Sequence, residues 1–248
     1  MAEVLEIQAF LSRAHQHPVI DVRSPLEFNK GHIPGAFNIP LLNDEVRVQV
    51  GTAYKKKGHH AAVKLAFELC GGDFYKMIKE AELICKGQDK TILVHCWRGG
   101  LRSNTMAWML SLSGFRVYLL KGGYKVFRNW ALAQFDKPKK VVILGGRTGS
   151  GKTDILKVLA ERGEQVIDLE GVAHHKGSAF GSLGQPAQPS NEHFENQLAL
   201  ICNALDPERL VWVENESRQV GSNIVPACHT FSYKLCFRNP DIKISSAS

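Results

Sequence analysis

The sequence predicts two α/β domains, each built around a mainly parallel β-sheet. Three observations support this fold class. Short apolar runs bounded by turn-forming residues alternate with amphipathic stretches, the pattern starts afresh after a polar segment at 136–140, and 44% of the 248 residues are hydrophobic. Since domains usually contain roughly 100 to 150 residues, this length favours two domains.

The first domain, residues 1–137, is expected to alternate strands and helices. A helix is predicted at 103–113, because apolar residues recur there with helical spacing and Gly114 provides a C-terminal cap. The longer, partly helical stretch 43–90 is interpreted as an insertion in this domain. The apolar runs that predict strands are 18–22, 91–95 and 117–120.

A second domain is expected at 138–226. Its predicted helix, 152–162, follows a glycine-rich loop and is ended by Gly163. Residues 227–248 show no sustained period of 2 or 3.6 and are interpreted as an atypical tail, so this domain is expected to be incomplete. Its predicted strands are 141–144, 165–169 and 210–213.

Charge is concentrated in the first domain. Residues 1–137 contain 19 Lys and Arg against 12 Asp and Glu, a net charge of +7, whereas residues 138–248 contain 12 of each. A basic domain favours a polyanionic partner, of which nucleic acid is the obvious example. A solvated basic surface without such a partner is the alternative.

The composition also indicates in which cellular compartment the protein is expected. The chain has no run of 18 apolar residues that would predict a membrane-spanning helix, and its first ten residues lack the basic segment of a signal peptide. Six cysteines occur without a CxxC pair or regular spacing. This usage is typical of a reducing compartment, so we expect a cytoplasmic protein that does not associate with membranes.

Cys96 is the strongest candidate for a nucleophile. It lies between the predicted strand 91–95 and the predicted helix 103–113, in a glycine-rich loop. Loop amides and the positive end of the helix favour a thiolate there, and Arg98 and Arg102 add positive charge. We therefore predict a catalytic Cys96 within an anion-binding loop, able to attack an electron-poor sulfur or selenium. A buried structural cysteine is the alternative.

Residues 146–153 match the phosphate-loop pattern GxxxxGK[ST] at every fixed position. The segment follows an apolar strand and opens a helix, as this motif requires. Lys152 is expected to reach the outer phosphates, and the Thr153 hydroxyl could bind Mg²⁺. A nucleoside triphosphate or another pyrophosphate would satisfy the loop. The residues predicted to bind phosphate are Gly146, Gly149, Ser150, Gly151, Lys152 and Thr153.

Further candidates follow strands of the second domain, at the sheet edge where ligands of open α/β folds collect. Asp168, Glu214 and Glu216 are candidate metal partners, although each could equally be an ordinary surface or capping carboxylate. No metal site is predicted beyond this candidate Mg²⁺ position. The other candidate site residues are His174, Ser178 and Arg218.

Two segments of the first domain carry a family resemblance. Asp21-Val-Arg-Ser-Pro-Leu-Glu-Phe28 and Gly31-His-Ile-Pro-Gly-Ala-Phe-Asn-Ile-Pro40 resemble the opening signature of rhodanese domains. The resemblance implies a rhodanese-like fold and transfer of a sulfur or selenium group through Cys96. A related class of cysteine-dependent phosphatases shares both signatures, and the seven residues from Cys96 to Arg102 do not exclude it.

A rhodanese-like domain followed by a P-loop NTPase-like domain is an uncommon combination, and its details resemble the tRNA 2-selenouridine synthase family. The motifs that carry this resemblance are Gly51-Thr-Ala-Tyr-Lys55, His95-Cys-Trp-Arg-Gly-Gly-Leu-Arg-Ser103, Gly145-Gly-Arg-Thr-Gly-Ser-Gly-Lys-Thr153, Leu169-Glu-Gly-Val-Ala-His-His-Lys-Gly-Ser-Ala-Phe-Gly181 and Val213-Glu-Asn-Glu-Ser-Arg218. Family members continue with a largely helical region that this chain does not match after about residue 226, so we expect it to be truncated or altered there.

The resemblance implies a two-step reaction on the wobble 2-thiouridine of tRNA. Geranyl diphosphate first alkylates the sulfur, and selenophosphate, made by a selenophosphate synthetase, then supplies the selenium that displaces the geranylthio group. The phosphate loop would hold the diphosphate, and Cys96 with Arg98 and Arg102 would serve the selenium step. A sulfurtransferase fused to a nucleotide-binding or kinase-like module that does not act on tRNA is the alternative. A regulatory nucleotide-binding module with an inactive rhodanese domain is disfavoured because Cys96 is present.

Overall fold

The computed structural model describes residues 2–86, 89–146, 151–176, 181–215 and 219–226, together with the backbone of 232–238 and 241–246. The chain forms two compact units, residues 1–130 and 131–248, each with its own α/β sheet. The division falls within helix α7 (Gly123–Ala133), a few residues before the predicted boundary at 137. The predicted α/β fold class is confirmed for both units.

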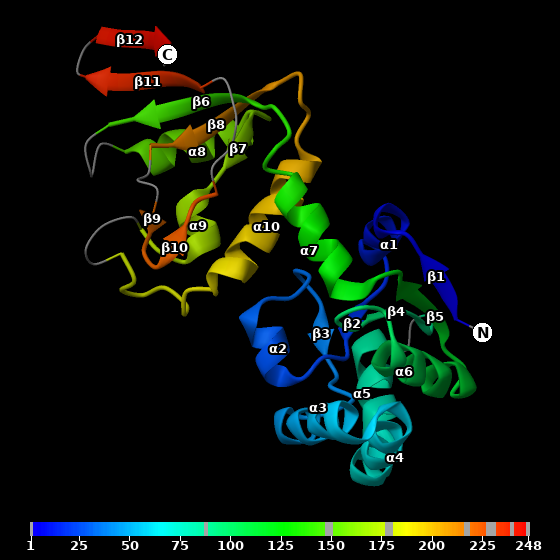
Figure 1. Ribbon diagram of the computed structural model, residues 1–248. Coiled ribbons are helices and arrows are strands. Elements are labelled where there is room, and N and C mark those ends of the chain that lie inside the picture. Colours follow the sequence, from blue (N-terminus) through cyan, green and yellow to red (C-terminus); the bar gives the residue numbers. More distant parts are fainter. Residues whose placement is uncertain are drawn as a thin grey trace. The chain divides into compact units, whose positions relative to one another are not determined.

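A five-stranded parallel sheet forms the centre of the first unit (Figure 1). Its order is β1-β5-β4-β2-β3, and register pairs such as Val94 with Leu119 align the carboxyl ends of neighbouring strands. The central strand β4 is buried at all five positions, as expected for a parallel sheet that is covered on both faces. The strands are β1 (Glu3–Leu5), β2 (Val19–Asp21), β3 (Phe37–Asn38), β4 (Thr91–His95) and β5 (Arg116–Leu120).

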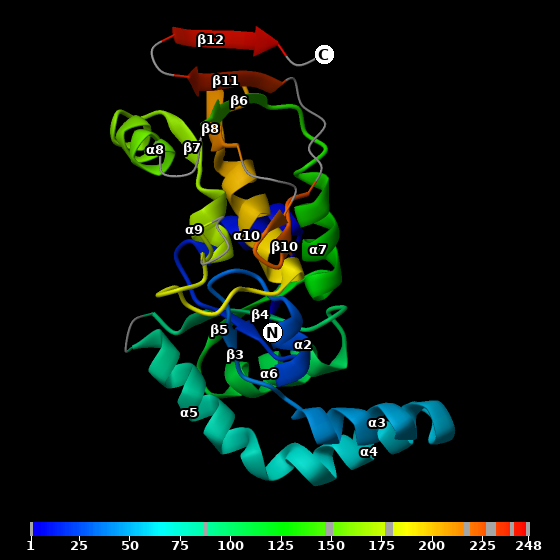
Figure 2. The same ribbon diagram turned by 90° about the vertical axis from the view of Figure 1, so that its left-hand side faces the viewer.

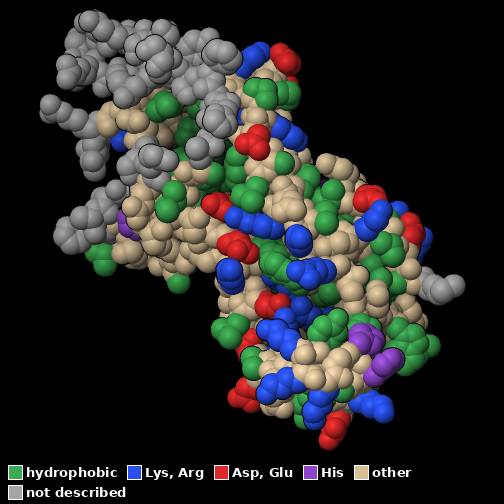
Figure 3. Space-filling view, in the orientation of Figure 1, with side chains coloured by type: hydrophobic (Ala, Val, Ile, Leu, Met, Phe, Trp, Pro, Cys, Tyr) green, Lys and Arg blue, Asp and Glu red, His purple; other side chains and the backbone are tan. Residues whose placement is uncertain are grey.

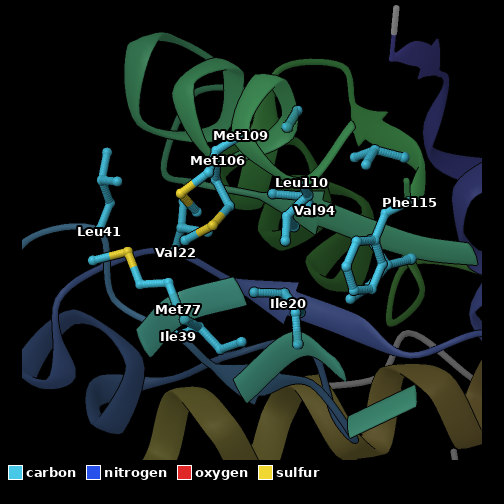
Figure 4. Packing of buried hydrophobic residues seen from close by; sticks show 14 of the residues in the cluster. Ile20, Val22, Ile39, Leu41, Met77, Val94, Met106, Met109, Leu110 and Phe115 are labelled. Carbon is cyan, nitrogen blue, oxygen red and sulfur yellow. The ribbon is translucent and has the colours of Figure 1, made fainter. Parts of the chain in front are cut away.

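Successive side chains of β4 point to opposite faces of the sheet and pack against different helices. Ile92 and Val94 belong to a hydrophobic cluster with Met106 and Leu110 of α6 (Leu101–Leu112) and with residues of α5 (Phe74–Cys85), as Figure 4 shows from close by. The opposite face is contacted by α1 (Ile7–Ala14) and by the start of α7, through aromatic side chains. The sheet is therefore a rigid support for the loop that leaves β4.

The expected insertion is almost entirely helical. After the short helix α2 (Pro25–Lys30), the chain forms α3 (Asp44–Lys57) and α4 (His59–Cys70), then a 3₁₀ turn at Gly71–Asp73 and α5. Asn43 caps α3 by accepting a hydrogen bond from the amide of Val46, and Gly58 separates α3 from α4 with a φ of 83°. In Figure 2, α3 and α4 lie side by side below the sheet.

The second unit is built on a sheet of order β12-β11-β6-β8-β7, in which all neighbours are parallel except β12 and β11. A separate antiparallel pair joins β9 and β10. Its elements are β6 (Lys140–Gly145), α8 (Lys152–Glu161), β7 (Gln165–Ile167), α9 (Leu169–Ala173), α10 (Asn191–Ala204), β8 (Leu210–Glu214), β9 (Gln219–Val220), β10 (Asn223–Ile224), β11 (Ser232–Arg238) and β12 (Asp241–Ser246).

The last 22 residues differ from the expectation of a tail without regular elements, since they contain β11 and β12. β11 adds to the sheet as a parallel neighbour of β6, with Leu235 opposite Leu144, and β12 returns beside it. The sequence does carry a period of 2 over this stretch, because Tyr233, Leu235 and Phe237 alternate with more polar residues. The run is too short to stand out within the longer aperiodic segment.

In the ranges that the structure describes, no helix combines the length and apolar character needed to cross a membrane.

Candidate active site

Cys96 occupies the carboxyl end of β4, where the chain leaves the sheet and turns into α6. Its side chain is buried. The Cys96 sulfur lies 3.3 Å from the Ser103 hydroxyl and accepts a hydrogen bond of 3.4 Å from the amide of Gly100. The Ser103 hydroxyl also lies 3.0 Å from the carbonyl oxygen of Gly100, so one turn of chain encloses the sulfur.

This enclosure changes the acidity of the thiol. Burial alone would raise the pKa of Cys96, because it removes water from the thiolate. Hydrogen bonds from Ser103 and from the amides of Gly100, Arg98 and Ser103 outweigh burial and lower the pKa below that of an ordinary thiol. For Cys70 and Cys85 burial is the largest influence, and it raises the pKa of each. The geometry therefore selects Cys96 as the reactive cysteine of this unit.

A glycine pair after β5 supports the cysteine loop from behind. Gly123 has a φ of 63°, and a Cβ there would lie 2.4 Å from the Cys96 carbonyl and 2.6 Å from the Gly99 amide. The amide of Tyr124 donates to that same Cys96 carbonyl at 2.8 Å. Only glycine fits this position, since a side chain would need both a left-handed backbone and space that the loop occupies.

The two predicted arginines have different surroundings. Arg102 binds both carboxylate oxygens of Glu27, with Nη1 on Oε2 and Nη2 on Oε1, and Arg47 lies 3.7 Å from Glu27 as well. Burial alone would raise the pKa of Glu27, but Arg102 and the other donors outweigh it and lower this pKa. Among the described residues, Arg98 makes no side-chain hydrogen bond or ion pair, so its charge is available to a ligand.

A buried ion pair lies beneath the loop. The Asp21 carboxylate and the Arg23 guanidinium are almost fully buried, and Nη2 of Arg23 donates to Oδ2 of Asp21 at 2.6 Å and to the carbonyl of Gly31 at 2.7 Å. The guanidinium also stacks over the Tyr124 ring, 3.8 Å from its centroid. This pair fixes the chain around β2 and ties it to the turn that supports Cys96.

His95, the residue before Cys96, is buried on the same face as this ion pair. Its Nε2 lies 3.8 Å from Oδ2 of Asp21. Burial lowers the pKa of His95 more than the nearby carboxylate raises it, so the ring is neutral at physiological pH. Burial alone would raise the pKa of Asp21, but the hydrogen bonds and the charge of Arg23 lower it. The network is therefore a support for the loop rather than a source of protons.

The second candidate site lies where β6 and β8 end in the second unit. Lys152, the first residue of α8, donates to the Gly146 carbonyl at 3.3 Å and forms an ion pair of 3.2 Å with Glu214. The Thr153 hydroxyl donates to the same carboxylate at 3.4 Å. Glu214 reaches them because β8 is the parallel neighbour of β6, with Leu144 opposite Glu214. Gly151, with a φ of 77°, introduces the helix.

Two other predicted residues of this unit that the structure describes, Asp168 and His174, are not part of that group. Asp168 caps α9 by accepting a hydrogen bond of 2.8 Å from the Gly171 amide, which is the capping alternative expected for it. The Nδ1 atom of His174 is 3.0 Å from the Ala187 carbonyl. Five further predictions fall outside the described residues: Gly149, Ser150, Ser178, Glu216 and Arg218.

No group of three or more His, Cys, Asp or Glu side chains that could hold a metal occurs among the residues described here. The donors that do meet are the Thr153 hydroxyl and the Glu214 carboxylate. Oxygen donors of this kind fit Mg²⁺, which usually takes few protein ligands and completes its shell with water and phosphate oxygens.

Comparisons with known proteins agree with this geometry. A model of the rhodanese-like domain matches residues 4–130, slightly more than half of the chain. The chain belongs to the rhodanese-like family. Beyond its rhodanese-like unit, residues 139–234 match a model described as the tRNA 2-selenouridine synthase AAA domain. Both predicted resemblances are confirmed.

Several curated relatives share the name tRNA 2-selenouridine synthase. Over 215 residues the chain is 41% identical to tRNA 2-selenouridine synthase from Shewanella sediminis, covering 85% of this chain and 57% of the relative. It is 44% identical over 221 residues to the protein of that name from Sulfurovum sp., covering 84% and 57%. The chain thus spans little more than half the length of these relatives.

Among solved structures, the N-terminal domain of a Clostridium difficile 630 protein, titled as ATP/GTP binding, covers 52% of this chain and 99% of that chain. Its sequence identity is 35% and its TM-score is 0.48.

Several residues of the rhodanese-like site were not singled out from the sequence. Ser103 is the last residue of the quoted loop motif, whereas Gly123 lies outside it, and both lie against the Cys96 segment. A signal for Gly123 was present, since a glycine pair two residues after a predicted strand indicates a turn with positive φ. Glu27 lies within the quoted signature, but its pairing with Arg102 depends on the fold.

Proposed function

We propose that this chain carries the catalytic units of a tRNA 2-selenouridine synthase, which replaces the sulfur of wobble 2-thiouridine with selenium. The observation that carries the proposal is the Cys96 sulfur, which is held by Ser103 and Gly100 with a lowered pKa at the end of β4. Support comes from the AAA-domain match and from relatives of that name. The reaction takes place in two steps, with S-geranyl-2-thiouridine as the intermediate.

In the first step the phosphate loop binds geranyl diphosphate. Lys152 and the start of α8 neutralise the diphosphate as it departs, while the 2-thiouridine sulfur forms a bond to C1 of the geranyl group. The C1–O bond breaks, and the electron pair leaves with the diphosphate. Thr153 and Glu214 would hold Mg²⁺ at this position, and the metal would supply further charge stabilisation.

In the second step Cys96 acts on selenophosphate. Selenium in this donor is already at the selenide level, so a direct sulfur–selenium bond would require an oxidant. Attack on phosphorus needs none: the Cys96 thiolate forms an S–P bond, the P–Se bond breaks, and hydrogen selenide leaves with the electron pair. Arg98 and the loop amides stabilise the phosphoryl oxygens. Water then releases phosphate and regenerates the thiol.

The released hydrogen selenide attacks C2 of the geranylated base and expels geranylthiolate. A selenophosphate synthetase would supply the donor, and tRNA phosphates would bind the basic residues of the rhodanese-like unit, with an affinity that falls steeply as salt increases. A tRNA substrate is consistent with the cytoplasmic location expected from the cysteine usage.

Mass spectrometry of the wobble base tests the proposal. The 248-residue chain is incubated with 2-thiouridine tRNA, geranyl diphosphate and selenophosphate, and we expect the mass of 2-selenouridine. Cys96→Ala should accumulate the geranylated base, whereas Cys202→Ala should behave as wild type. Lys152→Ala should block geranylation, while Lys157→Ala on the same helix should not.

Two results would overturn this function. If Cys96 takes sulfur from thiosulfate while the tRNA stays unchanged, the chain is a sulfurtransferase of the alternative class. If Lys152→Ala geranylates at the normal rate, the phosphate loop does not bind the geranyl donor.

A further inference from the structure

The rhodanese-like unit contains a cavity of about 500 Å³ that the reaction at Cys96 leaves without a role. It lies among α3, α4, the start of α5 and the start of α6. Its walls are largely apolar and include Val50, Val63, Phe67, Phe74 and Leu101. Its volume is within the range of roughly 300 to 1,000 Å³ that small-molecule sites occupy in proteins.

Positive charge accompanies this apolar lining. Arg47, Lys55, Arg98 and Arg102 line the cavity, and no carboxylate does so among the described residues. Figure 3 shows lysine, arginine and histidine side chains over the same insertion helices. An apolar cavity with a cationic margin fits an apolar chain that is attached to an anionic molecule.

Residues of the cysteine loop form part of the cavity wall. Arg98 and Leu101 belong to the segment that runs from Cys96 into α6, and both line the cavity. Gly51 of α3 also lines it, and a Cβ there would lie 2.9 Å from Nη1 of Arg47. A ligand in the cavity therefore contacts the same loop that holds the reactive sulfur.

We propose that this cavity binds the geranyl group of the S-geranylated base while the selenium step takes place at Cys96. The inference rests on the proposed function and adds a recognition element to it. The branched ten-carbon chain would occupy the apolar walls, and the tRNA phosphates would contact Arg98 and Lys55. Unmodified 2-thiouridine has nothing to fill the cavity, so selenium is directed to the geranylated base.

Geranyl diphosphate carries the same apolar chain, but the structure favours the base-linked form. The cavity is lined by residues of the Cys96 loop, which serves the second step, whereas the diphosphate of the first step has its own phosphate loop in the other unit. The two sources of the chain are distinguished by measuring each ligand separately.

Binding to the full chain provides the direct test. Calorimetry would compare S-geranyl-2-thiouridine nucleoside with 2-thiouridine nucleoside, and we expect the geranylated form to bind at least tenfold more tightly. Val50→Trp fills the cavity and should remove that advantage. Val48→Trp is the matched control, because Val48 is on the same helix, is 68% exposed and does not line the cavity. Val63→Phe is a milder second variant if Val50→Trp fails to fold.

Turnover adds a second readout. Val50→Trp should accumulate S-geranyl-2-thiouridine, with selenium incorporation reduced at least tenfold, whereas Val48→Trp should leave both steps unchanged. If Val50→Trp lost binding of the geranylated nucleoside and Val48→Trp did not, the result would support the cavity as the geranyl site. This would hold even if the wild-type protein incorporated no selenium, so the test of the cavity is separate from the test of the proposed function. Equal binding of both nucleosides, or a variant that weakens only geranyl diphosphate, would overturn it.

Discussion

The two candidate sites are assembled in different ways. At Cys96 the reactive atom and its main partners come from one short segment, residues 96–103, which is supported from behind by Gly123. In the second unit, Lys152 and Thr153 meet Glu214, which is more than 60 residues later in the chain and belongs to another strand. The first site depends on the shape of a loop, whereas the second depends on the pairing of two strands.

The two sites also differ in the charge of the groups that surround the reactive side chain. The partners of Cys96 are neutral hydrogen-bond donors, which lower the pKa of the thiol without forming an ion pair. The partner of Lys152 is a buried carboxylate of opposite charge, which competes with any anionic ligand for the ammonium group. A prebuilt loop should therefore be most sensitive to changes of backbone shape, and a charged pair to changes of charge.

The largest effect is expected from Gly123→Ala. The new Cβ would lie 2.4 Å from the Cys96 carbonyl, on a backbone with a φ of 63°. Left-handed backbone costs about 1–2 kcal/mol and the clash adds to it, so we expect the first unit to lose about 3–4 kcal/mol of unfolding free energy. Denaturant unfolding followed by tryptophan fluorescence measures this loss.

Gly114→Ala is the matched control. Gly114 has a φ of 83° in the same unit, but a Cβ there would meet nothing within 4 Å. It should cost only the backbone strain of about 1–2 kcal/mol. Equal losses in the two variants would mean that the turn after β5 does not support the cysteine loop.

A smaller effect is expected from Ser103→Ala, which tests whether the loop sets the acidity of the thiol. Because the pKa of Cys96 is lowered, alkylation by iodoacetamide should rise with pH earlier than for an ordinary thiol. Removing the Ser103 hydroxyl should raise this pKa and move the rate profile to higher pH. Peptide mass spectrometry after pulse labelling at each pH identifies the modified cysteine.

Ser111→Ala, on the same helix but without a contact to the sulfur, should leave the profile unchanged. Cys70 and Cys85 should react slowly throughout, because burial raises the pKa of both. A Cys96 profile that does not respond to Ser103→Ala would show that the loop amides alone control the thiol.

The contrast between the sites also explains what the sequence could predict. Cys96 and the phosphate-loop residues are found from one sequence because their chemistry depends on neighbours in the chain, and β4, α6, β6 and α8 follow from local apolar patterns. The pairing of Arg102 with Glu27 was not predicted, because it joins residues 75 positions apart. Arg102 was expected to stabilise the thiolate, and the structure pairs it with a carboxylate instead.

Position in the fold separated candidates that the sequence left equivalent. Glu214 and Asp168 both follow short strands, yet only Glu214 contacts Lys152 and Thr153, because β8 and not β7 is the neighbour of β6. Strand order is a long-range property, and local periodicity does not encode it. The cavity of the insertion was missed for the same reason, since its walls come from four separate helices.

Glu214→Gln gives the smallest expected effect and tests the charged pair of the second unit. Without metal, the carboxylate competes with pyrophosphate for Lys152, so its removal should tighten pyrophosphate binding about three- to tenfold, or about 1 kcal/mol. With Mg²⁺ present, wild-type protein should gain affinity because Glu214 and Thr153 hold the ion, and the variant should lose that gain. Calorimetry with pyrophosphate, with and without Mg²⁺, measures both affinities.

Glu208→Gln is the control variant. It removes an exposed partner of Lys140 at the opposite end of β6 and should change neither affinity. If Glu214→Gln shifted pyrophosphate affinity in the same direction with and without Mg²⁺, the carboxylate would act only through its charge on Lys152. Glu214 and Thr153 would then not form a metal site.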